Sequence, residues 1–272
     1  MRQWTIDAFA DQPFRGNPAC VIEPFDAWPD VAWMQALAQE NNQAETAFLL
    51  RTADPLRFGL RWFTPSTEVR LCGHATLASA HALTAELGLK GALAFDTLSG
   101  TLTVTWSEEG YRMDFPADTA RAVPGVPDLS YALGVEPKAV WVGQWVLALL
   151  KDEQTVRALK PATAAIMAVD GGAGWGPGHV AVAAIADADS PYDVVTRFFG
   201  PGAGIPEDPT TGALHCLSGP IFSARLGKPR VRFHQAYPGR GGDLIVEPRK
   251  DRVLLTGQAV TVIASVLRGP PR

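Results

Sequence analysis

Residues 73–88 read GHATLASAHALTAELG, and residues 212–227 read GALHCLSGPIFSARLG. Neither stretch has a charged side chain until near its end, where Glu86 and Arg225 occur. An α-helix that is apolar on every side is typically buried on every side. Each stretch therefore predicts a central helix that is covered by the rest of its domain.

The predicted helices cover residues 74–87 and 213–226, and each is followed by a glycine at the position that favours a left-handed residue. The second helix is predicted with an irregularity, because Gly219 and Pro220 fall in its middle. Proline lacks the backbone N–H that a helix interior needs, so we expect it to kink or interrupt this helix.

The two helices belong to a longer internal repeat. The glycines before and after them are spaced 139 residues apart, and RWFTP at residues 61–65 matches RFFGP at residues 197–201 with an offset of 136. The second copy therefore has three extra residues between its strand and its helix. We expect an α+β fold of two pseudo-equivalent domains, each a central buried helix wrapped by a bent, mostly antiparallel β-sheet or barrel.

The domain boundary is expected in the proline-rich stretch 116–127, where turn-forming residues replace the periodic pattern. This gives an N-terminal domain of residues 1–118 and a C-terminal domain of residues 119–272. The last strand, at about residues 258–272, is expected to be able to return to the first domain. Two domains that face each other would leave a cleft, which is the usual place for a small ligand.

Alternation of apolar and polar residues predicts β-strands along much of the remaining chain. The clearest strands are residues 4–9, 47–51, 56–63, 101–106, 230–235 and 244–247. A further helix is expected to begin after a cap at Asp30 and to run to Asn41. Its apolar face would carry Val31, Met34, Leu37 and Ala38.

Composition excludes several classes of protein. The 272 residues are 47% hydrophobic and have a formal net charge of −4 with a pI near 5.7, so neither a disordered chain nor a nucleic-acid binder is expected. The start has no apolar stretch typical of a secretory signal, and the longest apolar run, 140–150, is too short to span a membrane. Three cysteines cannot all pair, which favours a reducing, cytoplasmic setting.

Gly73 and Gly212 stand at the starts of the two predicted helices. Free backbone N–H groups and the helix dipole favour an anion at a helix N-terminus, and glycine lets a ligand approach the backbone closely. Such glycines can also serve only a tight turn, but the paired arrangement favours binding. We therefore expect a small molecule with a carboxylate to bind near both helix starts.

Candidate acid and base groups occur near the same segments. Glu45 has only small or apolar neighbours in AETAFLL, so loss of solvent could raise its pKa towards the range useful for proton transfer. The plain alternative is a solvated Glu at a strand end. Asp208 and His74 are further candidates for the acid and base groups. The plain alternatives are that Asp208 caps a helix or forms a turn, and that His74 serves only as a helix cap. His215 and Cys216 are expected to be core residues.

Other catalytic signatures are absent from the sequence, which has no HExxH, paired CxxC, Walker loop or GxSxG motif. His74 and His81 lack the further ligands that a metal site usually has. We therefore expect no nucleotide, flavin or metal cofactor. An enzyme built from carboxylates, histidine and helix ends is suited to moving protons.

With these motifs the sequence resembles the PhzF-like phenazine biosynthesis family, a branch of the diaminopimelate epimerase superfamily. The resemblance covers nearly the whole chain. It rests on DAF at residues 7–9, FRGNPA at 14–19, ETAF at 45–48, RWFTP at 61–65, LCGHATLA at 71–78, EDP at 207–209, TG at 211–212, and Gln235 with GR at 239–240.

The resemblance implies a homodimeric, cofactor-free isomerase of a biosynthetic process. The family's namesake enzyme isomerises a dihydro-hydroxyanthranilate by a proton shift. By motif, Glu45 would be the general acid/base that removes a proton from one carbon and returns it to another. His74 and Asp208 would bind and polarise the substrate, and the amides of Gly73 and Gly212 would help to hold it.

Two positions depart from the family pattern. Family members often have serine where this chain has Ala44 and Ala213, so two hydroxyl donors expected next to the substrate are missing. The substrate, the turnover of phenazine precursors and the direction of proton transfer stay open at this point. Two alternatives also stay open: a thiol-dependent racemase or epimerase that uses Cys72, and a ligand-binding member that has lost catalysis.

Overall fold

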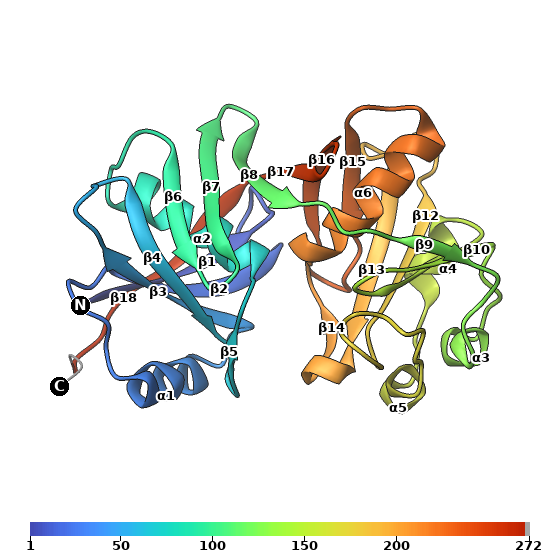
Figure 1. Cartoon of the computed structure of the whole chain (residues 1–272), viewed down its shortest axis with the longest axis horizontal. Helices are drawn as coiled ribbons and strands as arrows, with labels where there is room; N and C mark the ends of the chain where they lie inside the picture. Colours follow the sequence, from blue (N-terminus) through green and yellow to red (C-terminus); the bar gives the residue numbers. More distant parts are fainter. Residues whose placement is uncertain (270–272) are drawn as a thin grey trace. The chain divides into compact units, whose positions relative to one another are not determined.

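A computed structural model describes residues 1–269 of the chain, which divides into two compact units (Figure 1). Unit 1 contains Met1–Asp114 and the C-terminal segment that begins at Leu255, and unit 2 is Phe115–Leu254. The chain thus leaves unit 1 within one strand and re-enters it within another. The last three residues of the predicted strand at 258–272 lie outside the described residues.

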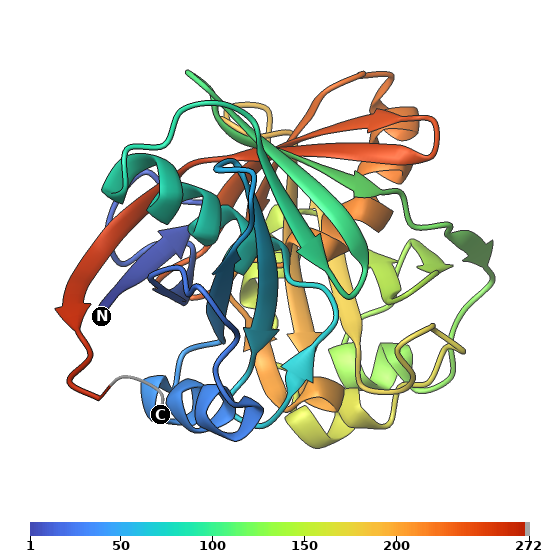
Figure 2. The ribbon, with the colours of Figure 1, turned by 60° about the vertical axis from the view of Figure 1, so that its left-hand side comes forward.

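Over its described residues, unit 1 consists mainly of strands, with two helices and a π-helical turn, η1. Its elements are β1 (Arg2–Ala8), β2 (Asn17–Ile22), α1 (Val31–Asn41), β3 (Glu45–Arg51), β4 (Arg57–Phe63), β5 (Glu68–Val69), α2 (Gly73–His81), η1 (Ala82–Glu86), β6 (Leu93–Thr97), β7 (Gly100–Ser107), β8 (Gly110–Pro116), which runs into unit 2, and β18 (Ala259–Val266). The C-terminal strand β18 pairs antiparallel with β1, and the two run side by side in Figure 2.

Unit 2 has more helices, but most of them are single turns. Its elements are β9 (Arg121–Val123), α3 (Leu129–Leu133), β10 (Ala139–Val142), β11 (Val146–Leu149), α4 (Glu153–Ala158), α5 (Thr163–Met167), β12 (Val180–Ile185), β13 (Val194–Gly200), η2 (Pro201–Ala203), β14 (Ile205–Asp208), α6 (Gly212–Leu226), β15 (Val231–Gln235), β16 (Gly242–Arg249), and β17 (Arg252–Gly257), which runs back into unit 1. Among the described residues, no helix combines the length and apolar character that a membrane span requires.

The two copies of the sequence repeat fold with the same strand topology. In unit 1, β2 and β3 are parallel, β3 and β4 antiparallel, β4 and β6 parallel, and β6 and β7 antiparallel. In unit 2, β11, β12, β13, β15 and β16 follow the same sequence of pairings. The predicted α+β fold with two pseudo-equivalent, mostly antiparallel sheets is confirmed.

The repeat also preserves an ion pair between a strand and the short strand after it. Arg61 of β4 contacts Glu68 of β5 at 2.7 Å, and Arg197 of β13 contacts Glu207 of β14 at 2.7 Å. The glutamate lies three residues further from the arginine in unit 2, which is where the second copy has its extra residues. The arginine in unit 2 is the more buried, with 4% of its side chain exposed against 22% for Arg61.

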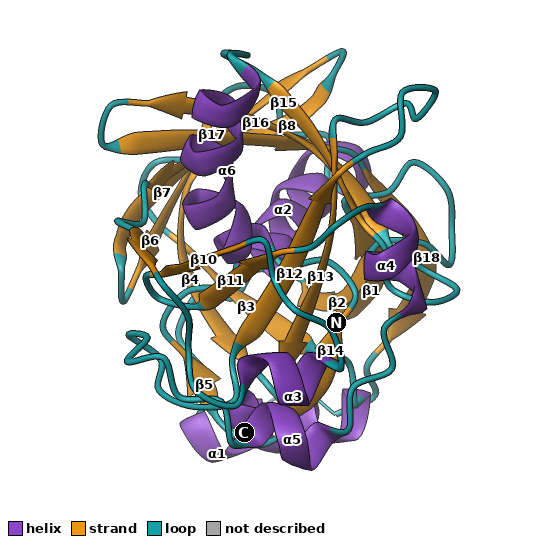
Figure 3. Cartoon of the chain, turned by 90° about the vertical axis from the view of Figure 1, so that its right-hand side faces the viewer, coloured by secondary structure: helices purple, strands orange, loops and turns teal. Residues whose placement is uncertain are grey.

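The central helix of each unit is buried, as its lack of charge predicts. Figure 3 shows helices α2 and α6 in purple among the strands. Every residue from Gly73 to Ala80 in α2 is buried, and the first half of α6 is buried except for Ala213. Polar side chains in α2 satisfy their hydroxyls within the helix. Thr76 donates to the Cys72 carbonyl at 2.5 Å and Ser79 donates to the Ala75 carbonyl at 2.7 Å.

The predicted interruption of the second central helix is wrong. Helix α6 is continuous across Gly219 and Pro220. Proline at position 220 cannot donate to the Cys216 carbonyl, but that carbonyl accepts a hydrogen bond from the Asp118 N–H at 3.1 Å. A partner from outside the helix therefore replaces the missing helical bond. Gly219 is also needed here, because a Cβ on it would lie 2.4 Å from Val246 Cγ1.

It is the first central helix that departs from α geometry. Helix α2 ends at His81 and continues as the π-helical turn η1, which the periodicity of the sequence did not predict. Gly88 and Gly227 follow the two helices with φ of 74° and 63°, so the predicted left-handed ends are confirmed.

Helix α1 begins and ends where the sequence predicted. The Asp30 side chain accepts from the N–H groups of Ala32 and Trp33. Two of the four residues on its predicted apolar face, Met34 and Ala38, are buried in a cluster with aromatic side chains. Val31 is 51% exposed, so its expected place on the buried face is wrong.

Candidate functional site

Two predicted site residues of unit 1 meet at the start of α2. Glu45 is the first residue of β3 and His74 is the second residue of α2, and they are 8% and 5% exposed. Glu45 Oε2 lies 2.9 Å from His74 Nε2 as a buried ion pair. The contact is not aligned as a hydrogen bond, and neither atom has a hydrogen-bond partner among the described residues. Both atoms therefore keep hydrogen-bonding capacity for a ligand.

The other ring nitrogen of His74 faces two further side chains. Cys72 Sγ is 3.5 Å from His74 Nδ1, and Asn17 Nδ2 is 3.2 Å from the same atom. The imidazole is thus held from both edges. Sequence reasoning did not propose Asn17 as a site residue. Its signal was only its position in the GNP segment, where β2 begins, and the structure adds that it is completely buried.

The pKa of His74 is set by burial and by the two side chains beside the ring. Burial lowers the pKa of the His74 imidazole, but the Cys72 sulfur and the Glu45 carboxylate beside it reverse the shift, and the pKa lies well above its usual value. Burial raises the pKa of the Cys72 thiol to about 11, so the sulfur is a neutral thiol near neutral pH. The sulfur and the carboxylate beside the ring both favour its protonated form.

This arrangement suits proton transfer. A buried carboxylate beside an imidazolium can accept a proton, and the imidazolium can stabilise negative charge that develops on a substrate. Gly73 is buried at the first turn of α2, and Ala44 is half-buried immediately before Glu45. Glu45, Cys72 and His74 have potential ligand atoms within 4.8 Å of one another, but the sulfur and the carboxylate face opposite nitrogens of the ring.

The corresponding segment of unit 2 is organised around Asp208, the last residue of β14. Asp208 is 8% exposed and accepts a 2.5 Å hydrogen bond from the Thr211 hydroxyl. The buried Gln235 amide ties the same loop together: its Nε2 donates to the Asp208 carbonyl at 2.7 Å, and its Oε1 accepts from the Thr211 N–H at 2.9 Å. These bonds fix the approach to helix α6.

Helix α6 then starts with Gly212, which is buried, and Ala213, which is half-buried. His215 lies one turn into the helix, fully buried, and its Nδ1 donates to the Thr211 carbonyl at 2.9 Å. Burial lowers the pKa of His215 to about 4, so the ring is neutral at physiological pH. His215 and Cys216 are both buried, which confirms their prediction as core residues.

An aromatic cluster borders Asp208, and sequence reasoning did not predict it. Asp208 pairs with Phe198 across β13 and β14, and the Phe198 ring packs edge-on against Trp145 at 5.0 Å between centroids. Trp145 also packs against Trp175 at 5.0 Å and His179 at 5.9 Å. Trp175 is 47% exposed, so one face of the cluster reaches the surface of unit 2.

The predicted site residues thus form two groups. Unit 1 brings together Glu45 and His74, with Gly73 and Ala44 as sequence neighbours. Unit 2 holds Asp208, Gly212 and Ala213. That the two groups act together on one substrate stays a prediction from the sequence.

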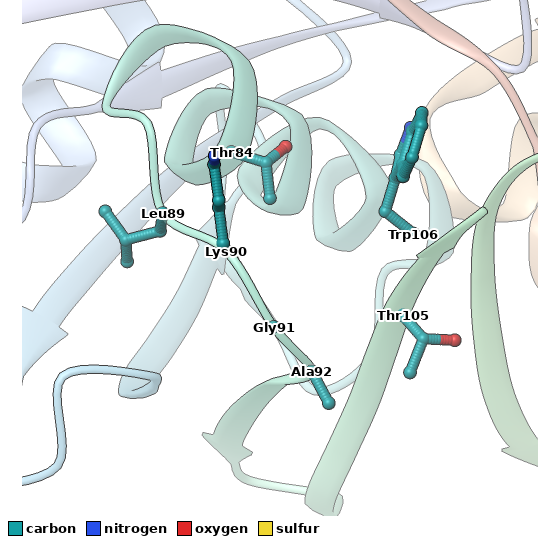
Figure 4. Close-up of a pocket in the computed structure, with 7 residues that line it drawn as sticks. All are labelled: Thr84, Leu89, Lys90, Gly91, Ala92, Thr105 and Trp106. Atoms are coloured by element: carbon teal, nitrogen blue, oxygen red, sulfur yellow. The ribbon is translucent and has the colours of Figure 1, made fainter. Parts of the chain in front are cut away.

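Two surface pockets lie away from these residues. One of about 560 Å³ on unit 1 is formed by the end of η1 and by β7 (Figure 4), and it is lined by Thr84, Leu89, Lys90, Gly91, Ala92, Thr105 and Trp106. The other, of about 430 Å³, is on unit 2 between α3 and α4 and is lined by Leu133, Gly134, Val135, Gln154, Thr155, Ala158, Leu159 and Lys160. None of the predicted site residues lines either pocket.

The chain is similar to known proteins in both sequence and structure. Residues 6–265 match the PhzC-PhzF family, described as phenazine biosynthesis-like protein. An uncharacterized isomerase of Pseudomonas aeruginosa is 40% identical over 264 residues, which covers 96% of each chain. A phenazine biosynthesis-like domain-containing protein of Mus musculus is 35% identical over 285 residues, again 96% of each chain.

Solved structures of the same family are also similar to this chain. The phenazine biosynthesis protein of the PhzF family from Enterococcus faecalis superposes with a TM-score of 0.89 at 36% identity, over 98% of this chain and 99% of that one. A probable proline racemase from Agrobacterium radiobacter superposes with a TM-score of 0.59 at 16% identity, over 99% of this chain and 93% of that one. The second likeness concerns the fold alone.

Proposed function

The chain belongs to the phenazine biosynthesis-like (PhzC-PhzF) family and is an enzyme of the isomerase class, and we propose that it moves a proton between carbons of a small carboxylate-bearing substrate. Glu45 is the general acid/base. The observation that carries the proposal is the buried Glu45–His74 pair, whose facing atoms lie 2.9 Å apart and make no hydrogen bond with the described residues.

The proposed reaction is an isomerisation, so the substrate and the product have the same atoms. Glu45 accepts a proton from one carbon of the substrate, and the electron pair left behind is delocalised into an adjacent unsaturated, carboxylate-bearing system. The protonated Glu45 then returns the proton to a second carbon of that system. One carboxylate can serve both carbons when they lie on the same side of the substrate.

His74 has a supporting role in this proposal. Its charged ring stabilises the negative charge that builds up on the substrate after the proton has left. The Cys72 and Asn17 contacts on the opposite nitrogen keep the ring oriented towards Glu45. Asp208 is proposed as a second polar group for the substrate, with the amides of Gly73 and Gly212 as hydrogen-bond donors, on the strength of the sequence motifs alone.

The substrate is proposed only by class. Ala44 and Ala213 offer no hydroxyl, so we expect a ligand with fewer polar groups at these points than one that two serines would bind. The dihydro-hydroxyanthranilate suggested by the sequence resemblance is one candidate. Other small unsaturated carboxylates fit the proposed chemistry equally well.

A thiol-dependent racemase is disfavoured by the state of the sulfur. With a pKa of about 11 the Cys72 thiol is protonated at neutral pH, and a thiol is a poor base. The two mechanisms differ in which substitution causes the larger loss of proton-transfer activity. Under the proposed mechanism Glu45→Gln impairs proton transfer far more than Cys72→Ser does, whereas a thiol base requires Cys72→Ser to be at least as damaging.

The experiment is solvent labelling. Wild-type protein is incubated in D₂O with the dihydro-hydroxyanthranilate and with a panel of small unsaturated carboxylates, and C–H signals are followed by NMR. We expect loss of a C–H signal, by exchange with deuterium, in at least one compound. A compound that binds, as shown by line broadening, but keeps all its C–H signals would identify a binding protein and contradict the proposal.

Two further properties of the protein are proposed, its oligomeric state and its compartment. The family resemblance indicates a homodimer, which sedimentation or light scattering measures directly. The three cysteines are all free and buried, in keeping with a reducing compartment such as the cytoplasm.

A further inference from the structure

The aromatic cluster beside Asp208 has no role in the proton-transfer mechanism proposed above. Phe198 and Asp208 lie directly opposite each other on the antiparallel strands β13 and β14. Side chains at such paired positions project from the same face of a sheet, with about 4.5–5.5 Å between their Cβ atoms. The Phe198 ring in turn packs edge-on against the buried Trp145 ring, with 5.0 Å between their centroids. A wall of aromatic rings therefore begins next to the Asp208 carboxylate.

Trp175 is the member of this cluster that reaches the solvent. It is 47% exposed, although the centroid of its ring lies 5.0 Å from that of Trp145 and 5.9 Å from that of His179. The Trp175 N–H donates to the Gln144 carbonyl at 3.3 Å, so the backbone that carries the ring is tied to the segment before Trp145. The side chain is thus attached at a fixed point, and its exposure leaves room for the ring to rotate.

His179 adds a second, independent observation, because one nitrogen of its buried ring is unused. The residue is 4% exposed, and its Nδ1 lies 3.4 Å from the Gly176 carbonyl. A carbonyl can only accept, so Nδ1 carries the proton and Nε2 of the neutral ring is an acceptor. Nε2 is buried and has no hydrogen-bond partner among the described residues, whereas buried polar atoms normally have one. An unused acceptor among aromatic rings indicates a donor group that comes from a ligand.

The packing around His179 also indicates which group moves when a ligand reaches it. The Gly202 backbone lies against one edge of the imidazole, where a Cβ would be 2.5 Å from His179 Cε1 and 2.9 Å from Nδ1. Trp145 is buried, at 5% exposure. Trp175 is the neighbour on the surface, so its ring is the one able to turn aside.

We propose that Trp145, Trp175 and His179 form a subsite for the flat, unsaturated ring of a ligand that carries a hydroxyl or amino group. The ring of the ligand stacks on Trp145 in the place that Trp175 now fills, and Trp175 closes over its outer face. The hydroxyl or amino group donates to His179 Nε2. Flatness is the selected property, because stacking against an indole face requires a flat partner.

The part that this subsite plays in substrate choice rests on the proposed function, although binding of a flat ring does not. Asp208 is proposed as a polar group for the substrate, and Phe198 connects it to the cluster. Among small unsaturated carboxylates, the subsite would therefore select cyclic, planar ones. Open-chain or saturated acids would leave the Trp145 face and the His179 nitrogen without a partner.

The test is a titration of the full chain with three acids, followed by NMR. The acids are meta-hydroxybenzoate, benzoate, and hydroxycyclohexanecarboxylate, which is the saturated counterpart of the first. We expect meta-hydroxybenzoate to bind about 10-fold more tightly than the saturated acid, which is the upper range of what an aromatic pair adds beyond the area that it buries. Its hydroxyl is expected to add about 5-fold over benzoate, as one neutral hydrogen bond does.

Three variants assign these preferences to residues. Trp175→Leu keeps an apolar side chain but cannot stack, and it is expected to reduce the preference for the flat acid to about 2-fold or less. His179→Asn keeps a donor near the Nδ1 position and removes Nε2, so the preference for meta-hydroxybenzoate over benzoate is expected to disappear. Trp106→Leu, at a 61% exposed tryptophan of unit 1, is the matched control and is expected to keep both preferences. Thermal unfolding of each variant checks that it is folded.

Three results would overturn the subsite: no binding of meta-hydroxybenzoate, equal binding of the flat and the saturated acid, or a preference that Trp175→Leu leaves intact. The last result decides the matter even if the buried His179→Asn variant does not fold. The two proposals fail separately. A protein that binds flat acids through Trp175 but exchanges no C–H proton of any candidate substrate removes the function and keeps the subsite. A protein that exchanges protons, and whose Trp175→Leu variant keeps the preference for flat acids, removes only the subsite.

Discussion

Helices α2 and α6 occupy equivalent places in the two units, yet the histidines near their starts are in opposite states. Both rings are buried. Burial lowers the pKa of His74, but the Cys72 sulfur and the Glu45 carboxylate raise it well above its usual value. His215 has the Thr211 carbonyl as its partner, and burial lowers its pKa to about 4. Burial alone therefore favours a neutral core histidine, whereas a sulfur and a carboxylate beside the ring favour a charged one.

This difference predicts that unit 1 carries the proton chemistry. Substitution of the two histidines tests the prediction, and it has the largest expected effect on activity. His74→Asn removes the charge beside Glu45 and is expected to slow solvent exchange of the substrate by about 100-fold or more. His215→Asn is expected to slow it by no more than a few-fold. The rate of solvent exchange is measured by NMR for each variant. An equal loss of rate in both variants would contradict the proposed difference between the units.

The ion pairs Arg61–Glu68 and Arg197–Glu207 allow a second comparison between the units, of how much each pair contributes to stability. Arg197 is 3% exposed, pairs with Glu207, and donates to the carbonyls of Val156 and Leu159. Its replacement by methionine leaves the half-buried Glu207 carboxylate and those carbonyls without the arginine, so we expect a loss of about 3 kcal/mol in the free energy of unfolding. Arg61→Met breaks a more exposed pair and is expected to cost about 1 kcal/mol or less. Urea denaturation measures both, and the reverse order would contradict the burial argument.

The neutral state of His215 predicts an acid-side loss of stability. Its folded pKa of about 4 lies below its ordinary value of 6.5, so the unfolded chain binds the proton more readily. The stability associated with the neutral ring is fully present above pH 6.5 and is lost as the pH falls towards 4, by up to about 3 kcal/mol.

His215→Asn isolates this contribution. The difference in unfolding free energy between wild type and the variant is expected to shrink as the pH is lowered from 7 to 4. A difference that stays constant over this range would mean that the ring does not titrate as described.

The smallest expected effect concerns the helix interiors. Gly219 of α6 corresponds to Ala80 of α2 in the 139-residue repeat. Gly219→Ala would place a Cβ 2.4 Å from Cγ1 of the buried, stiff Val246 side chain, and we expect a net loss of about 1 kcal/mol, because the cost of overpacking exceeds the gain in helix propensity. Ala80→Gly is expected to cost a similar amount through propensity. Urea denaturation measures both variants. A stabilising effect of Gly219→Ala would show that the contact between α6 and Val246 has room for a methyl group.

The sequence predicted the fold through features that act locally or repeat. Uncharged helices, the Asp30 cap and the matched RWFTP and RFFGP strands were sufficient for the two-domain α+β fold. The course of α6 through Pro220 was not predictable, because the Cys216 carbonyl is satisfied by Asp118, which is remote in sequence. The π-helical turn η1 was missed for a related reason, since apolar periodicity does not distinguish α from π geometry.

The candidate site was predicted in identity but not in arrangement. Glu45 and His74 were chosen from sequence, and the structure brings them to 2.9 Å. The participation of Cys72 and Asn17 around the imidazole depends on the parallel pairing of β2 with β3 and on the path of the chain into α2, which single-sequence patterns do not specify.

The central claim is that the Glu45 carboxylate carries the proton. The most direct measurement is the rate of deuterium incorporation into the substrate that the labelling screen identifies, with Glu45→Gln beside wild type and with Glu40→Gln, on the exposed surface of α1, as the control. Glu45→Gln is expected to lower the rate by about 10²–10⁴-fold with unchanged thermal unfolding, while Glu40→Gln matches wild type. Deuterium incorporation by Glu45→Gln at the wild-type rate would contradict the account.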